Sequence, residues 1–190
     1  MTMLPPDTMQ TLTDFADQAV VLPLILAVAL SLGVLGWWRG ALAWLVAVGC
    51  SFAAVLLFKL VFTTCGPALG LGALRSPSGH TAAAALIVGG IAVALGSDRR
   101  LAAAIALLAA VLIGATRVAL GLHTAAEVVL GAALGVLGVI GFAFAAGKPP
   151  ALRLRWMFVA VIAVALLLHG QHLHVEGQIR AAAFWLSFCR

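Results

Sequence analysis

Long apolar runs, separated by short polar or glycine-rich breaks, fill most of the chain. A helix of about 20 apolar residues is long enough to cross the hydrocarbon core of a bilayer. Runs of about this length recur along the chain, and the last of them is shorter. The predicted spans are residues 19–38, 41–62, 80–96, 101–121, 123–147 and 156–168. This pattern predicts an all-α, polytopic membrane protein that folds as a six-transmembrane-helix bundle.

The two ends of the chain have a different pattern. Residues 1–18 contain Pro5-Pro6 followed by apolar positions at helical spacing, and residues 171–190 have the pattern of an amphipathic tail. Both are expected to lie at the membrane interface, within one membrane-embedded domain that covers residues 1–190. The apolar stripe of the tail consists of Val175, Ile179, Ala182 and Leu186.

Glycines recur on one face of the fifth predicted span. Gly131, Gly135 and Gly138 follow the helical spacing i, i+4 and i+7. Small residues in this pattern let membrane helices approach each other closely, so this face is predicted to be a packing surface.

Charge is scarce and unevenly distributed. Hydrophobic residues make up 64% of the chain and charged residues 9%, with a formal net charge of +5. The cations stand singly or in short loops, which argues against a nucleic-acid partner. The positive-inside rule makes the basic loops cytoplasmic and places the acidic N-terminus on the other side. The basic loops contain Arg39, Arg99, Arg100, Lys148, Arg153 and Arg155.

The three cysteines lack the spacing of a metal site. Cys50 falls within a predicted span and fits a packing role. Cys65 and Cys189 fall on the same predicted side of the membrane, so a disulfide between them is left open.

Histidines gather near the C-terminus, where His169, His172 and His174 precede Glu176. On a helix His169 and His172 would be neighbours, whereas His174 would point away from His172. A solvent-exposed segment at the membrane interface is therefore the favoured interpretation, and a regulatory metal site or a contact with lipid head groups is the alternative.

Two polar stretches interrupt the apolar pattern and contain the candidate chemistry. They are Arg75–His80, with the sequence Arg-Ser-Pro-Ser-Gly-His, and Thr116–Glu127. In each, a histidine opens the next apolar segment with the same tetrapeptide, His-Thr-Ala-Ala. If both start helices, two helix N-termini present backbone N–H groups and positive dipole ends, which favour an anion. Arg75, Arg117 and Lys59 would add positive charge, and phosphate fits this set best.

Within the second stretch, His123 and Glu127 are four residues apart, which places them on one face of the expected helix. A carboxylate there can hold the proton of one ring nitrogen and leave the other nitrogen free to attack, as in catalytic triads. Arg117 fits bidentate binding of a phosphate, and an interface anchor is its alternative. Lys59 fits either a phosphate ligand or a side chain that extends to the nearby surface.

These residues resemble the type 2 phosphatidic acid phosphatase superfamily, whose members carry three sequence blocks. The second block is complete as Pro77–His80, with the sequence Pro-Ser-Gly-His. The third block keeps its spacing from Arg117 through His123 to the acidic residue. It has Thr116 in place of serine and Glu127 in place of aspartate.

The first block is incomplete. Lys59 and Pro67 are in register, but Gly66 stands where the family has arginine. We expect Arg75, which directly precedes the second block, to supply the missing positive charge. The resemblance covers residues 59–127.

The resemblance implies roles for these residues. His123 would be the nucleophile that becomes phosphohistidine, and His80 would protonate the leaving oxygen and then help to activate water. Glu127 would replace the aspartate that orients the nucleophile. No metal and no cofactor is expected. The residues expected to bind phosphate are Arg117, Lys59, Arg75 and, through their backbone N–H groups, Ser78 and Gly79. A turn that starts the next helix is the alternative role of Ser78 and Gly79.

The resemblance therefore implies a metal-independent phosphatase that removes a terminal phosphate from a lipid, with the bilayer and a lipid phosphate as its partners. Undecaprenyl pyrophosphate is the leading substrate, and phosphatidylglycerophosphate, phosphatidic acid and lipid A 1-phosphate are alternatives. A lipid phosphotransferase and a non-catalytic phospholipid binder or transporter are alternative functions. The expected location is the bacterial cytoplasmic (inner) membrane, with the site on the periplasmic or extracytoplasmic side. No oligomeric state follows from the sequence.

Overall fold

Eight helices form the part of the chain that the structure describes. The computed structural model describes residues 5–66, 68, 70, 76–151, 155–173 and 175–185, and no strand occurs among them. The prediction of an all-α fold is confirmed. The helices are α1 (Pro6–Asp14), α2 (Gln18–Val34), α3 (Trp38–Cys65), α4 (Gly79–Ala94), α5 (Arg99–Ala119), α6 (Ala125–Ala146), α7 (Arg155–Leu168) and α8 (Val175–Trp185).

Each of the six predicted spans corresponds to one of the helices α2 to α7. Four helical stretches are long and apolar enough to cross a membrane, namely Pro6–Val34, Trp38–Cys65, Arg99–Ala119 and Ala125–Ala146. α4 and α7 have 16 and 14 residues, or about 24 and 21 Å of helix at 1.5 Å per residue. Both are shorter than the hydrocarbon core of about 30 Å. The helices thus form a membrane bundle, and the count of six spans stays a prediction.

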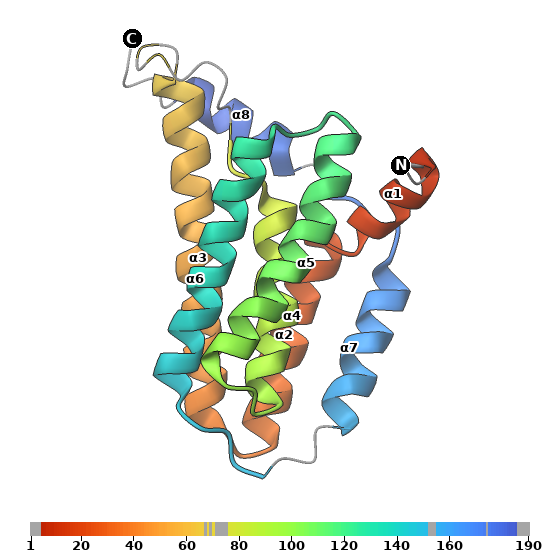
Figure 1. The fold of residues 1–190 in the computed structure, drawn as a ribbon, viewed down its shortest axis with the longest axis vertical. Helices are drawn as coiled ribbons and strands as arrows, with labels where there is room; N and C mark the ends of the chain where they lie inside the picture. Colours follow the sequence, from red (N-terminus) through yellow and green to blue (C-terminus); the bar gives the residue numbers. More distant parts are fainter. Residues whose placement is uncertain are drawn as a thin grey trace.

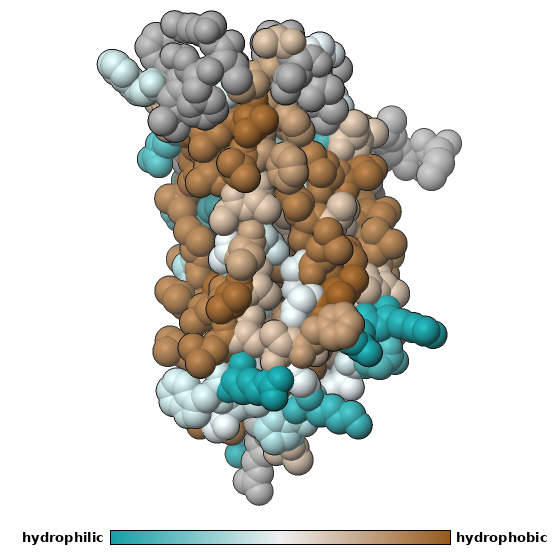
Figure 2. Space-filling model, turned by 90° about the vertical axis from the view of Figure 1, so that its left-hand side faces the viewer, coloured by the Kyte–Doolittle hydropathy of each residue, from teal (hydrophilic) through white to brown (hydrophobic). Residues whose placement is uncertain are grey.

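The outer surface of the bundle is apolar, as contact with lipid requires. Leu26, Leu30 and Leu112 are 58%, 67% and 61% exposed, although burial of such side chains away from water is strongly favoured. Figure 2 shows a broad hydrophobic band over the middle of one face, with hydrophilic side chains below it.

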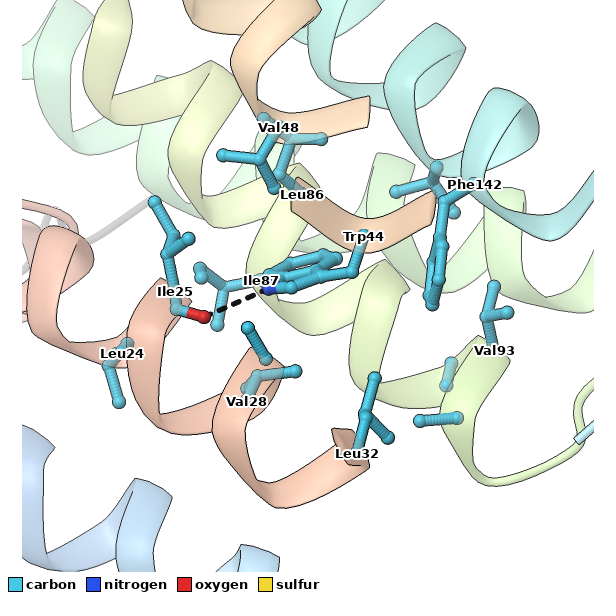
Figure 3. Packing of buried hydrophobic residues seen from close by; sticks show 14 of the residues in the cluster. Leu24, Ile25, Val28, Leu32, Trp44, Val48, Leu86, Ile87, Val93 and Phe142 are labelled. Carbon is cyan, nitrogen blue, oxygen red and sulfur yellow. Dashed lines mark hydrogen bonds between the residues drawn. The ribbon is translucent and has the colours of Figure 1, made fainter. Parts of the chain in front are cut away.

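α4 lies at the centre of the bundle and is buried on almost every side. Its alanines and glycines let α5 and α6 pack closely against it. Gly90 of α4 lies directly against the ring of Trp44, where a larger residue would collide. The Trp44 Nε1–H donates a hydrogen bond of 3.0 Å to the Ile25 carbonyl (Figure 3), so the indole joins α2, α3 and α4 in one core.

The predicted glycine face of α6 is a packing surface, which confirms that prediction. A side chain at Gly131 would collide with the backbone of Ser78, and one at Gly135 would approach the Ala82 carbonyl to 2.7 Å. Gly138 lies as closely against α3. The beginnings of α4 and α6 are therefore held side by side.

The two ends of the bundle differ (Figure 1). One end contains the links α2–α3, α4–α5 and α6–α7, at which Arg39, Arg99, Arg100, Lys148 and Arg155 lie. There the Arg39 Nε–H donates to the Ala145 carbonyl at 2.8 Å, and the Arg99 guanidinium lies 3.9 Å from the centre of the Phe144 ring. The other end contains α1, α8, the start of α4 and the link between α5 and α6. The predicted polar stretches lie at this second end.

Candidate active site

A cavity of about 960 Å³ lies at the end of the bundle where α4 and α6 begin. It brings together side chains from α3, α4, α5 and α6 that are far apart in the sequence. Arg75 and Pro67 lie outside the described residues, and Ser78 does not line the cavity. The predicted site residues that line it are Lys59, Gly79, His80, Arg117, His123 and Glu127.

His123 lies before helix α6 and not on it, which corrects the predicted helix start. Thr124 is the N-cap, and the helix begins at Ala125. The contact between His123 and Glu127 forms nonetheless, with 3.0 Å between His123 Nδ1 and Glu127 Oε2. It forms because Glu127 occupies the third position of the helix and its side chain turns back toward the cap, as in a capping box. This turn also accommodates the extra methylene of glutamate relative to aspartate.

The Glu127 carboxylate is held by backbone donors. Its Oε2 accepts the Thr124 N–H at 3.0 Å and its Oε1 accepts the Ser76 N–H at 2.9 Å, and the residue is only 4% exposed. A carboxylate fixed in this way acts as an acceptor, which assigns the ring proton of His123 to Nδ1. The Nε2 of His123 is then the nitrogen with a free lone pair.

Ser78 has a structural place that differs from its predicted role as a phosphate ligand. Its N–H donates to the Glu127 carbonyl at 3.0 Å, so this donor is already used. Its hydroxyl oxygen caps α4 by accepting the Thr81 backbone N–H at 3.4 Å. The same oxygen also accepts the Thr81 hydroxyl at 2.9 Å, and the side chain is fully buried. Ser78 therefore ties the start of α4 to α6, and Gly79 is the residue of this pair that faces the cavity.

Two cations face the cavity from α3 and α5. Lys59 is 4% exposed, so it does not extend to the surface as its alternative interpretation required. Arg117 lies in the last turn of α5, and its carbonyl accepts the N–H groups of Leu122 and His123 at 3.0 and 3.3 Å. Gly121, at φ +68°, allows this tight turn. The same turn thus positions both Arg117 and His123.

Burial lowers the pKa of the His123 imidazole below its usual value of 6.5; Lys59 and Arg117 lower it further, and Glu127 opposes the shift. A lowered pKa keeps the ring neutral at pH 7. The neutral ring, with its proton on Nδ1, is the form that can act as a nucleophile.

Asp17 faces His80 from the start of α2 and was missed in the sequence. The distance between Asp17 Oδ2 and His80 Nε2 is 3.7 Å. Asp17 is the N-cap of α2, and its Oδ1 accepts the N–H groups of Ala19 and Leu173 at 2.9 and 3.1 Å. An aspartate just before an apolar run is an N-cap signal, so the sequence did contain the means to place it at a helix start.

The segment between α7 and α8 crosses the α1–α2 junction at the edge of the cavity. His169 Nε2 lies 3.1 Å from the Thr11 carbonyl, and His172 Nδ1 lies 4.0 Å from Asp14 and 3.7 Å from Asp17. Among the described residues no group of three or more potential ligands is arranged for a metal ion. His174 lies outside those residues.

α8 forms part of the cavity wall. Three of the residues in the predicted apolar stripe, Val175, Ile179 and Ala182, line the cavity, and Leu186 lies outside the described residues. The face expected to meet the membrane interface therefore faces the cavity.

The cysteines fall into two classes. Cys50 is free and exposed, whereas Cys65 is disulfide-bonded. The sequence left open whether Cys65 pairs with Cys189, and Cys189 lies outside the described residues.

Comparison with known families agrees with this geometry. A family model described as the PAP2 superfamily matches residues 21–151. The chain belongs to the PAP2 superfamily. PAP2 proteins are phosphatases that hydrolyse phosphoric esters, so this chain is a hydrolase of that kind. No curated protein and no solved structure gave a significant match.

The PAP2 match includes all the predicted site residues that line the cavity. Asp17, the α7–α8 segment and α8 lie outside it. The cavity of this PAP2 phosphatase is therefore lined by residues within the match and by residues that lie beyond both of its ends.

Proposed function

We propose that this PAP2 phosphatase removes the terminal phosphate of a lipid phosphate through a phosphohistidine on His123. The observation that carries the proposal is the pair His123–Glu127, 3.0 Å apart, in one cavity with His80, Lys59 and Arg117. This set contains a nucleophile with its orienting carboxylate, a second imidazole for proton transfer, and cations for the phosphate.

In the first step, His123 Nε2 attacks phosphorus and the bond between phosphorus and the leaving oxygen breaks. His80 gives its proton to that oxygen, so the lipid leaves as a neutral alcohol, or as a monophosphate if the substrate is a diphosphate. The Nδ1 proton of His123 stays shared with Glu127 Oε2, which stabilises the positive charge that the ring acquires.

In the second step, water attacks the phosphohistidine. His80, now neutral, takes a proton from that water, and the bond between phosphorus and Nε2 breaks. Inorganic phosphate is released, His123 returns to its neutral form, and His80 is protonated again. Both histidines thereby return to their starting protonation states after each turnover.

Phosphate binding is assigned to Lys59, Arg117 and the N-terminus of α4. Arg117 offers a planar fork of donors, whereas the Lys59 ammonium acts as a point charge. Gly79, the first residue of α4, contributes a backbone N–H at the positive end of the helix dipole. These groups stabilise the charge on the phosphoryl oxygens in the transition state.

The apolar wall of the cavity supports a lipid as the substrate. Phe52, Val55 and Leu56 of α3 and Ile179 of α8 line it. Because the volume of about 960 Å³ exceeds what a phosphate group needs, part of a hydrocarbon chain fits beside this wall. Undecaprenyl pyrophosphate is the leading substrate. Phosphatidylglycerophosphate, phosphatidic acid and lipid A 1-phosphate share the same chemistry.

The distribution of charge supports an orientation in the membrane. The links α2–α3, α4–α5 and α6–α7 lie at the end opposite to the cavity and carry Arg39, Arg99, Arg100, Lys148 and Arg155, and basic loops remain in the cytoplasm. The cavity then faces the extracytoplasmic side, which in a bacterial inner membrane is the periplasm.

Phosphate release by the purified protein in detergent tests the proposal. Each of the four lipids is offered to the wild type and to His123→Ala, and the protein is quenched for detection of acid-labile, alkali-stable phosphate. Steady release with a transient phosphohistidine, both absent in His123→Ala, supports hydrolysis. Release that requires an acceptor lipid indicates a phosphotransferase, and no turnover of any lipid phosphate indicates a binder or transporter; either result overturns the proposal.

A further inference from the structure

The cavity places two opposite demands on His80. Lys59 and Arg117 concentrate positive charge to bind a phosphate, and both act electrostatically on His80. A general acid in the first step must carry a proton, and therefore a positive charge. Burial and two nearby cations all disfavour that charged form. His80 needs a nearby anion to resolve this conflict.

Asp17 is placed to be that anion. Its Oδ2 lies 3.7 Å from His80 Nε2, an ion-pair distance, and the two side chains are 8% and 17% exposed. Water screens such a pair less than it would on the surface. The carboxylate is fixed at its other oxygen by the Ala19 and Leu173 N–H groups, so it is held in place without the imidazole.

We propose that Asp17 is a positioning residue for His80, whose carboxylate stabilises the protonated imidazole between Lys59 and Arg117. The proposal rests on the proposed function, because it concerns the proton that His80 gives to the leaving oxygen. It assigns to the start of α2, outside the PAP2 match, a part in the reaction.

The charged neighbours of His80 define how the pair behaves with pH. Lys59 of α3 and Arg117 of α5 oppose its protonation, and Asp17 favours it. His172, 3.7 Å from the same Asp17 oxygen, competes for the carboxylate when it is itself protonated. The cavity also contains the ionisable pair His123 and Glu127, which supplies the nucleophile and its orienting carboxylate and takes no part in the proton transfers of His80.

Asp17→Asn separates charge from structure. Asparagine is as good an N-cap as aspartate, and its side-chain oxygen can still accept the Ala19 and Leu173 N–H groups. The variant therefore removes the negative charge and leaves the start of α2 intact. Asp14→Asn is the matched control, because Asp14 is also buried and also lies near His172, at 4.0 Å. Melting of all variants in detergent checks their folding.

Two substrates distinguish proton donation from general damage. Octyl phosphate releases an alkoxide that needs a proton, whereas p-nitrophenyl phosphate releases an anion that is stable near neutral pH. For Asp17→Asn at pH 7, we expect kcat on octyl phosphate to fall about 10- to 100-fold, with a change within about 3-fold in the p-nitrophenolate burst rate. The alkaline limit of kcat on octyl phosphate is expected to move to lower pH. Asp14→Asn should match the wild type on both substrates.

The His80→Ala background provides the decisive control. If Asp17 acts through His80, adding Asp17→Asn to His80→Ala causes no further loss. Equal losses on both substrates, an additive loss in the double variant, or full activity of Asp17→Asn would overturn the role of Asp17. If His80→Ala itself keeps wild-type turnover, the proposed function fails instead, so the two failures are distinguishable.

Discussion

The His123 half of the cavity comes from one short stretch of chain, whereas the His80 half is assembled from distant elements. His123 and Glu127 are joined at 3.0 Å by a turn and a capping box. His80 and Asp17 lie on α4 and at the start of α2, 3.7 Å apart. The first pair therefore depends on local backbone geometry, and the second depends on how the helices pack.

This difference separates the two catalytic tasks. A nucleophile must keep one tautomer and one orientation through both steps. A local turn fixes both without requiring that distant helices pack precisely. A proton donor and acceptor changes its charge in each step, and a looser ion pair that forms across helices allows this. Small changes in helix packing should consequently affect His80 before they affect His123.

Removing either imidazole should give the largest effects on turnover, and only the variant that lacks His80 should accumulate phosphohistidine. We expect His123→Ala to lower turnover by about 10⁴-fold or more and to form no phosphohistidine, because the nucleophile is missing. His80→Ala should lose about 10²- to 10⁴-fold, yet accumulate phosphohistidine from p-nitrophenyl phosphate, whose leaving group needs no proton. Quench-flow with detection of the phosphoprotein measures both; phosphohistidine in His123→Ala would contradict the assignment.

Neutralising the Glu127 carboxylate should give the next largest effect on turnover. Glutamine fits a capping box as glutamate does, so Glu127→Gln preserves the start of α6 but no longer stabilises the charged imidazole. We expect kcat to fall about 10²- to 10⁴-fold, as for the orienting aspartate of a triad. Asp98→Asn is the control, since Asp98 also caps a helix, by accepting the Arg100 and Leu101 N–H groups at the opposite end. Its activity should be unchanged.

Adding one methyl group between the His80 and His123 halves of the cavity should give a smaller effect on turnover. The side chain in Gly131→Ala would collide with the Ser78 backbone and push the start of α4, with His80, away from α6. We expect a loss of about 1–3 kcal/mol in stability and a reduction of about tenfold in kcat through misplacement. Gly141→Ala, on the same helix with no atom within 4 Å of the new carbon, should be neutral or stabilising.

A measurable loss of stability in Gly141→Ala as large as that in Gly131→Ala would show that the effect comes from the helix itself. Thermal inactivation in detergent and kcat on a lipid phosphate, measured for both variants, decide the matter.

The smallest expected effect is a shift in pH dependence. The reaction needs neutral His123, whose pKa is lowered below 6.5 mainly by burial. Protonation removes the nucleophile as pH falls, so the acidic limit of kcat/KM should lie below pH 6.5. Glu127 raises this pKa, so the residual activity of Glu127→Gln should have its acidic limit at still lower pH. A limit that lies above 6.5, or that moves upward in the variant, would contradict the assignment.

The sequence predicted the parts of the molecule that depend on local information. Glycine, proline and charged residues end the apolar runs, so each predicted span has a helix within a few residues of its position. The spacing of His123 and Glu127 also predicted their contact, although it forms through the capping box at Glu127 and not along one face of a helix. The prediction was wrong about the helix start at His123, because the Thr124 cap and the turn at Gly121 compete with the helix at that point.

The parts that the sequence did not predict depend on packing between distant segments. Asp17 looked like one acid in a polar flank, and only the approach of α2 to α4 brings it to His80. Ser78 fitted a phosphate ligand, but the close contact at Gly131 places its N–H against the Glu127 carbonyl. Neither arrangement leaves a trace in the spacing of residues along the chain.

The burial of α4 on nearly every side has a consequence for engineering. Its alanines and glycines leave no room for larger residues, so mutant libraries directed at α4 should yield mostly unfolded protein. The apolar cavity wall differs, because Phe52, Val55 and Leu56 of α3 and Ile179 of α8 line a cavity of about 960 Å³. Directed evolution toward new lipid chains is therefore best directed at Phe52, Leu56 and Ile179, which are more exposed than the buried Val55.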